Sequence, residues 1–226
     1  MVTLTPDESR VLGVLIEKSL TTPNQYPLSL NAIVDGSNQK NNRDPVLQMS
    51  EDAAFAAAEG LREKQLAVRI DQVGGRVHKY RHNAIETLHV RTAEVVILAE
   101  LLMRGPQTLG ELRGRASRMH PLESIERVKD MIRALTDRPE PYVQQIPPSP
   151  GSRAERYVQL LCPNLHEIPM TEAIDSPPSG SPATSSIQAR VERLETEVQE
   201  LRASISKLAM AVGEESLARD NPSDHP

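Results

Sequence analysis

The stretch AVRIDQVGGRVHKYR, residues 67–81, decides the fold of the first half of this chain. On both sides of Gly74 and Gly75, apolar and polar residues alternate with the period of two that a half-buried β-strand requires. Adjacent glycines accept the positive φ angles of a tight turn without steric cost. The stretch therefore predicts a β-hairpin.

Three helical segments precede this hairpin. Thr5 and Glu8 form the pattern of a capping box, which opens a first helix that extends to about Leu20. Residues 28–34 predict a short second helix, and residues 50–65 predict a third after a polar loop. Three helices followed by a hairpin is the order of a winged helix-turn-helix.

The same order returns after residue 91. We expect helices over residues 93–103, from the capping box of Thr108 and Glu111 to about Ser117, and over 121–136. Strands then follow at residues 142–146 and 156–161. The sequence thus predicts an α+β, mainly α fold of two tandem winged helix-turn-helix units, residues 1–90 and 91–168.

The remaining residues change in composition. Residues 169–186 are rich in Pro, Ser, Gly and Thr and predict a disordered linker. Residues 187–213 predict a coiled-coil helix, before a disordered tail at 214–226. The apolar residues of this helix are spaced alternately four and three residues apart, as in a heptad repeat: Ile187, Val191, Leu194, Val198, Leu201, Ile205, Leu208 and Val212. β-branched residues at a and mostly Leu at d favour a parallel homodimer, although such a helix could instead pack on the protein's own body.

Composition narrows the classes of function. Aromatic residues make up only 2% of the chain, which disfavours the stacking platforms of single-strand and RNA binders. No apolar run reaches 18 residues, and the first eight residues lack the pattern of a signal peptide, so we expect a cytoplasmic protein without a membrane partner. The net charge of −5 falls entirely in residues 169–226, which leaves the body near neutral.

The sequence contains no recognisable catalytic pattern. One cysteine and six scattered histidines give no metal-ligand spacing, and no Gly-rich phosphate loop or nucleophile motif occurs. We therefore expect no enzyme, no metal and no cofactor, and we look for a binding function.

The polar segment 38–44, between the second and third helices, carries the most unusual composition. Its basic and amide side chains suit contacts to the phosphates and bases of DNA. The same residue types also suit a tight turn. Further basic residues lie around the turn of the second unit and on the wings, the β-hairpins of the two units. The candidate nucleic-acid-binding residues are Lys40, Asn41, Asn42, Arg43, Arg76, Lys79, Arg113, Arg115, Arg118 and Arg153.

Two functions remain open at this point. The first is a dimeric, regulatory, DNA-associating protein that contacts double-stranded DNA through its turns and wings. The second is a protein–protein interaction adaptor that uses its winged-helix surfaces without DNA. Glu51 and Asp52 favour the adaptor, because they occupy the start of the third helix, where a DNA reader meets base edges.

Two long motifs carry a resemblance to a known family. Residues 22–31 read TPNQYPLSLN and residues 38–46 read NQKNNRDPV. Together with the opening Leu-Thr-Pro, these motifs closely resemble the YceH family of bacterial proteins over residues 3–168. The resemblance implies a tandem winged-helix fold and little about activity. Family members commonly carry Cys where this chain has Ser37, so a thiol role there does not apply to this chain.

Overall fold

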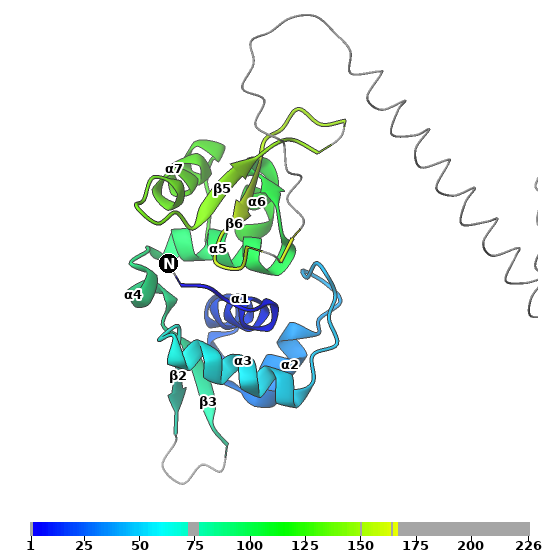
Figure 1. Ribbon diagram of the computed structural model, residues 1–226, viewed down its shortest axis with the longest axis vertical. Helices are drawn as coiled ribbons and strands as arrows, with labels where there is room; N and C mark the ends of the chain where they lie inside the picture. Colours follow the sequence, from blue (N-terminus) through cyan, green and yellow to red (C-terminus); the bar gives the residue numbers. More distant parts are fainter. Residues whose placement is uncertain (1, 72–76, 150, 164, 167–226) are drawn as a thin grey trace, which may run out of the picture. The chain divides into compact units, whose positions relative to one another are not determined.

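The computed structural model of the chain describes residues 2–71, 77–149, 151–163 and 165–166. All of these belong to one compact unit, residues 1–172 (Figure 1). The predicted linker, heptad helix and tail lie outside the described residues, as do Gly74 and Gly75 at the expected hairpin turn.

The first half of the unit is built from helices and a small antiparallel sheet. Its elements are α1 Pro6–Thr21, the 3-10 turn η1 Pro23–Gln25, β1 Leu28–Ser29, α2 Leu30–Ser37, α3 Glu51–Glu63, β2 Ala67–Ile70, β3 Lys79–His82 and α4 Ala84–Leu88. The sheet has the order β1-β3-β2, and β2 pairs with β3 in the register Ala67 to His82. The two predicted strands are therefore confirmed.

The second half repeats this order within the described residues, without counterparts of η1 and α4. It consists of α5 Thr92–Arg104, β4 Gln107–Thr108, α6 Leu109–Ala116, α7 Ile125–Thr136, β5 Val143–Ile146 and β6 Arg156–Gln159. Its sheet order, β4-β6-β5, matches that of the first half. The α+β, mainly α class is confirmed. The boundary predicted at residue 90 falls between α4 and α5, inside the compact unit.

Side-chain caps fix where the helices begin. Thr5 and Glu8 form the predicted capping box, and Thr108 and Glu111 form the second. Two predicted starts were wrong. The helix expected from Leu28 begins at Leu30, because the Ser29 hydroxyl accepts from the Ala32 amide while Leu28 pairs with Tyr80. The helix expected from Pro121 begins at Ile125, because Ser124 caps it.

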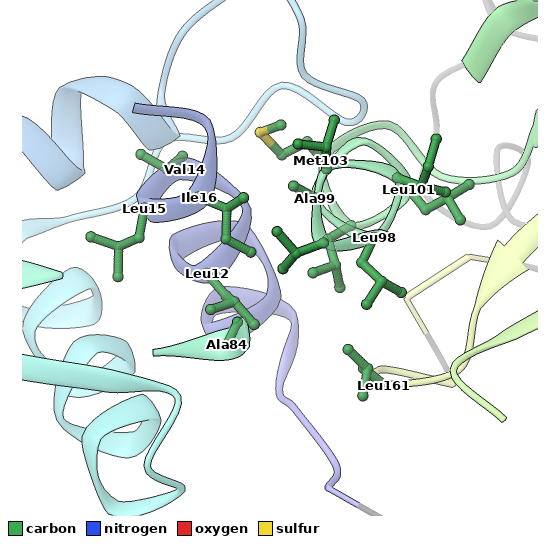
Figure 2. Packing of buried hydrophobic residues seen from close by; sticks show 14 of the residues in the cluster. Leu12, Val14, Leu15, Ile16, Ala84, Leu98, Ala99, Leu101, Met103 and Leu161 are labelled. Atoms are coloured by element: carbon green, nitrogen blue, oxygen red, sulfur yellow. The ribbon is translucent and has the colours of Figure 1, made fainter. Parts of the chain in front are cut away.

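The two halves share one hydrophobic core, whose centre is the packing of α1 on α5. Figure 1 shows α1 between α3 and α5. Ile16 of α1 points toward α5 (Figure 2), and Leu12, Ile16, Leu98 and Ala99 are all buried. Gly13 permits the close approach, because a Cβ at this position would lie 2.6 Å from Cγ of Met103.

Backbone hydrogen bonds add to this packing. The Leu4 amide donates to the Leu161 carbonyl at 2.7 Å, and the Asp44 amide donates to the Met103 carbonyl at 2.9 Å. The segment between α2 and α3, which carries the predicted DNA-contacting turn, is therefore attached directly to the second half.

Candidate interaction surface

The turn after α2 divides into an exposed and a buried part. Lys40 and Asn41 are exposed. Asn42 is half-buried, and its side-chain oxygen accepts from the guanidinium of Arg104. Arg43 is buried. Only the first two of these four candidates face solvent, so the turn presents one cation and not two.

Acceptors from four residues hold Arg43 in the interior. Its guanidinium donates to the Gly36 carbonyl at 3.0 Å, the Asn42 carbonyl at 2.8 Å, Oε1 of Gln39 at 3.2 Å and Oε2 of Glu17 at 2.5 Å. The side chains of Arg43 and Glu17 are 0% and 2% exposed. Arg43 would have to abandon these partners to reach a phosphate, against the expectation from the sequence.

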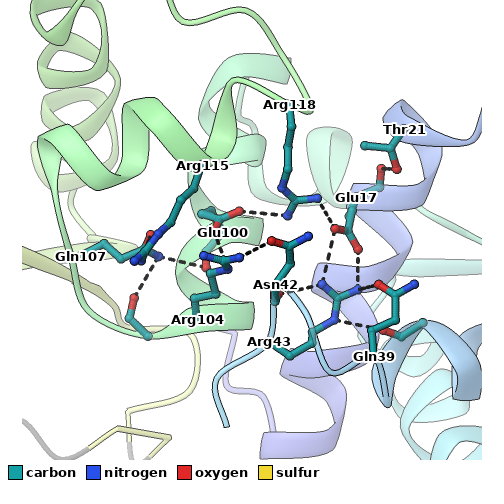
Figure 3. Close-up of polar contacts among 12 residues, drawn as sticks. Glu17, Thr21, Gln39, Asn42, Arg43, Glu100, Arg104, Gln107, Arg115 and Arg118 are labelled. Atoms are coloured by element: carbon teal, nitrogen blue, oxygen red, sulfur yellow. Dashed lines mark hydrogen bonds and ion pairs between the residues drawn. The ribbon is translucent and has the colours of Figure 1, made fainter. Parts of the chain in front are cut away.

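Glu17 belongs to an ionic cluster that joins the two halves, which we define as Glu17, Arg43, Glu100, Arg104 and Arg118 (Figure 3). Arg118 from the second half donates to Glu17 and also to Oε2 of Glu100, at 3.1 Å. Burial disfavours the charge on Glu17, but hydrogen bonds and charges from Arg43 and Arg118 outweigh it and lower the pKa of Glu17. The two arginines thus favour the ionised form of Glu17 in the interior.

The arginines near the second turn are also engaged within the protein. Arg113 donates to the carbonyls of Leu122 and Glu123, at 3.3 and 3.0 Å. Arg115 donates to Oε1 of Gln107 at 2.9 Å and pairs with Glu111 at 3.1 Å. With Arg118 in the ionic cluster, all three predicted bases of this region have internal partners.

The predicted wing residues are dispersed. Lys79 is half-buried in β3, Arg153 is exposed between β5 and β6, and Arg76 lies outside the described residues. Within the described part of the chain, Arg43 and Arg118 share Glu17 as a partner, whereas Lys79 and Arg153 belong to different halves.

A groove lies instead between α3 and β3, on the first half. We call it the α3–β3 groove. It has a volume of about 610 Å³ and is lined by Ser29, Leu30, Asn31, Glu51, Phe55, Val77, His78, Lys79 and Tyr80. Phe55 and Val77 are 46% and 57% exposed, and both face this groove. Large apolar side chains that gather at one concave place mark a binding surface better than apolar side chains scattered singly.

The exposed charge of α3 is mainly acidic, and one of its carboxylates, that of Glu51, lines the groove. Glu51, Asp52 and Glu63 of α3 are exposed, and we call them the exposed carboxylates of α3. Glu59 is half-buried, accepts from the Tyr80 hydroxyl at 3.2 Å and pairs with Arg62 at 2.9 Å. The start of α3, where a recognition helix would approach bases, therefore carries two exposed negative charges.

On the strand side, charges are largely compensated. His78 and Arg69 both contact Asp71, at 2.5 and 3.6 Å. Lys79 is the cation that lines the groove.

Sequence reasoning missed both the groove and the ionic cluster, although signals for each existed. The buried residues of α3 are Ala54, Ala57, Ala58 and Leu61. Phe55 falls outside that stripe, so its exposure followed from helical spacing. Glu17 and Glu100 are single acids in apolar helical stretches, and buried acids require partners.

Within the described ranges, no three His, Cys, Asp or Glu side chains gather closely enough to hold a metal ion. In the same part of the chain, no helix has the length and apolar character that crossing a membrane requires.

Comparison with known proteins places the chain among close relatives. Residues 4–172 match the family described as "Protein of unknown function, DUF480". A UPF0502 protein of Pelobacter propionicus is 44% identical over 91% of this chain and 93% of the relative. One from Geotalea daltonii is 48% identical over 78% and 79%, and one from Shewanella sp. is 40% identical over 91% and 97%.

Proposed function

The chain belongs to the DUF480 family, and we propose that it acts as a protein–protein interaction adaptor that docks partners in the α3–β3 groove. The observation that carries this proposal is the joint exposure of Phe55 and Val77 in one groove. Burying apolar surface is the main favourable term in protein association. Aromatic residues are enriched among the few interface residues that contribute most of the binding free energy.

The fold supports this proposal by analogy. We take each half to be a winged helix-turn-helix unit, as the repeated order of elements and the resemblance to the YceH family suggest. In such a unit α3 would be the recognition helix. Here the start of that helix carries Glu51 and Asp52, which would repel phosphates, and Phe55, which offers no hydrogen bond to a base edge.

A quantitative affinity purification tests the adaptor function. The wild type, Phe55→Ser and Val46→Ser would each be expressed in a cell that naturally makes this protein. Val46 is the matched control, because it is 54% exposed but does not line the groove. We expect the same proteins to accompany the wild type and Val46→Ser, and at least about a tenfold loss with Phe55→Ser. Equal recovery with all three variants would reject the proposal.

The DNA-associating alternative is tested by a salt titration against mixed-sequence duplex DNA. A protein that neutralises several phosphates loses affinity steeply with salt, with a log–log slope of about −0.9 for each contact. We expect no such binding, because Arg43 is buried, and Arg113, Arg115 and Arg118 already bond to acceptors of the protein itself. Tight binding at low salt with a slope of several units would favour DNA instead.

A further inference from the structure

We propose that the outer edge of β5 is a second docking site, which binds an extended acidic segment of another protein by strand addition. The site belongs to the second half and shares no lining residue with the α3–β3 groove, so the inference goes beyond the proposed function. The backbone of β5 supplies hydrogen bonds to the partner, and Lys129 and Arg133 of α7 face its acidic side chains.

β5 occupies an edge of its sheet. In the order β4-β6-β5, β5 pairs with β6, and no strand of the described residues pairs with its other side. Just before β5 begins, the Leu160 amide donates to the Tyr142 carbonyl at 2.8 Å. Backbone groups alternate in direction along an antiparallel strand, so those of Val143 and Gln145 turn away from β6. These two residues therefore offer donors and acceptors to an added strand.

The sequence of β5 leaves this edge unprotected. Natural sheets commonly shield edge strands with charged side chains, prolines, bulges or very short strands. β5 reads Val-Gln-Gln-Ile, with neither charge nor proline. The edge strand β2 of the first half carries the exposed Arg69, which pairs with Asp71 at 3.6 Å, and β1 and β4 have two residues each. Among the described strands, β5 is therefore the edge most open to pairing.

A groove between α7 and β5 gives an added segment its place. It has a volume of about 530 Å³, and its lining includes Ile132 of α7 together with Val143 and Gln145 of β5. An occupant of this groove excludes water from the outward backbone groups of β5. A helix would leave those groups without partners, which is unfavourable. An extended segment replaces the lost hydrogen bonds through its own backbone.

The charges of the groove favour an acidic segment. Lys129 and Arg133 line it one turn apart on α7, both exposed, and neither side chain forms an ion pair or hydrogen bond with another described residue. The one carboxylate among the lining residues, that of Asp137, accepts from the Thr136 hydroxyl at 3.2 Å. Acidic side chains at alternate positions of an added strand share one face and can meet both cations. A second copy of β5 would bring four uncharged residues and leave the cations unpaired.

Three fluorescent peptides of about eight residues, a common strand length, serve as probes of this chemistry. Each is measured by anisotropy with the full-length protein. The first alternates Val and Glu, and the second alternates Val and Lys. The third is the first with a methyl group on every backbone nitrogen, which removes its donors. We expect the Glu peptide to bind at least about tenfold more tightly than the other two, and salt to weaken it.

Variants of β5 separate backbone pairing from side-chain contact. Gln145→Pro removes one outward amide and keeps the hydrogen bonds to β6, so it should weaken the Glu peptide about tenfold or more. Gln145→Ala keeps the amide and should stay within about twofold. Arg69→Pro is the matched control in β2, because Arg69 pairs with Tyr80 as Gln145 pairs with Tyr157. It should also stay within about twofold.

Variants of α7 test the charges. Lys129→Gln combined with Arg133→Gln should weaken the Glu peptide about tenfold. Arg127→Gln is the matched control, because Arg127 is exposed on the same helix but does not line the groove, and it should stay within about twofold. Circular dichroism confirms that each variant is folded, and the charge variants leave the backbone of the sheet unchanged.

The outcomes separate this site from the other surfaces. Failure of the Glu peptide to bind, equal binding of the Lys peptide, or binding that survives Gln145→Pro would overturn the inference. Phe55→Ser should leave the affinity of the Glu peptide within about twofold. A loss there would assign the peptide to the α3–β3 groove instead. If residues 1–172 dimerise and Gln145→Pro makes them monomeric, the occupant of the edge is a second copy and the acidic partner is wrong.

Discussion

Arg43 shows that a charged residue in a polar turn can be buried and paired inside the protein. In the sequence it lies among Asn and Lys side chains, so it reads as a phosphate contact. In the structure its charge is matched by Glu17 of α1, 26 residues earlier in the chain. The pairing could not be predicted from local pattern, since it depends on how the turn returns over α1. The only sequence signal for it was Glu17, an acid that stands in an apolar stretch of the first helix.

Replacing Arg43 with Met is expected to destabilise the protein strongly. The methionine keeps much of the side-chain volume but leaves Glu17 with one fewer partner in the interior. Removing one member of a buried ion pair costs about 3–5 kcal/mol. Because Arg118 still contacts Glu17, we expect the lower end, about 3 kcal/mol, in the free energy of unfolding measured with urea.

Two further variants act as controls for Arg43→Met. Arg127→Ala changes an exposed arginine of α7 and should alter stability by no more than about 0.5 kcal/mol. Adding Glu17→Met to Arg43→Met should recover part of the loss, because it removes the uncompensated charge. An unchanged free energy of unfolding in Arg43→Met would show that Arg43 is not held in the interior.

At the scale of elements, locally encoded features were predictable and long-range ones were not. The capping boxes at Thr5 and Thr108 depend on residues three apart, and both were identified from the sequence. The two-residue strands β1 and β4 were missed, because they exist only through pairing with β3 and β6 far along the chain. The short helix α4 was missed as well, since five residues give too little periodicity to detect.

Gly13 provides a test of the packing of α1 on α5. Gly13→Ala should destabilise the protein by about 1 kcal/mol, because the added Cβ would crowd Met103 and outweigh the helical preference of alanine. Gly114→Ala in α6 is the matched control, with no atom near its added Cβ, and should stabilise by up to about 1 kcal/mol. Urea unfolding of both variants gives the comparison. Equal gains at the two positions would contradict close packing at Gly13.

For the whole molecule, we predict dimerisation through residues 187–212, which lie outside the described residues. A heptad seam of fewer than four heptads is short, so the dimer should depend on concentration. Light scattering at roughly tens of micromolar should find the full chain dimeric. It should find residues 1–172, the compact unit, monomeric.

A substitution in the full chain completes this comparison. Leu194→Asp with Leu201→Asp introduces charges at two d positions, which cannot be buried without a large desolvation cost. This variant should be monomeric yet folded. If residues 1–172 dimerise as tightly as the full chain, the compact unit carries the interface, and the heptads serve another purpose.

The proposed adaptor function concerns the whole molecule too, and only part of its candidate site was predictable. Glu51 and Asp52 argued against DNA already in the sequence, because their place at the start of a helix is a local feature. The groove was not predictable, because it forms only where Val77, 22 residues further along the chain, comes to line the same groove as Phe55.

Site-specific photo-crosslinking at position 55 tests the central claim most directly. A photoreactive phenylalanine derivative replaces Phe55 with little change of shape, and the same derivative at Val46 provides the control. After illumination in cells, we predict discrete crosslinks to protein from position 55 and none of comparable yield from position 46. Crosslinks from position 55 to DNA, or equal yields from both positions, would contradict the account of the α3–β3 groove as a protein-docking site.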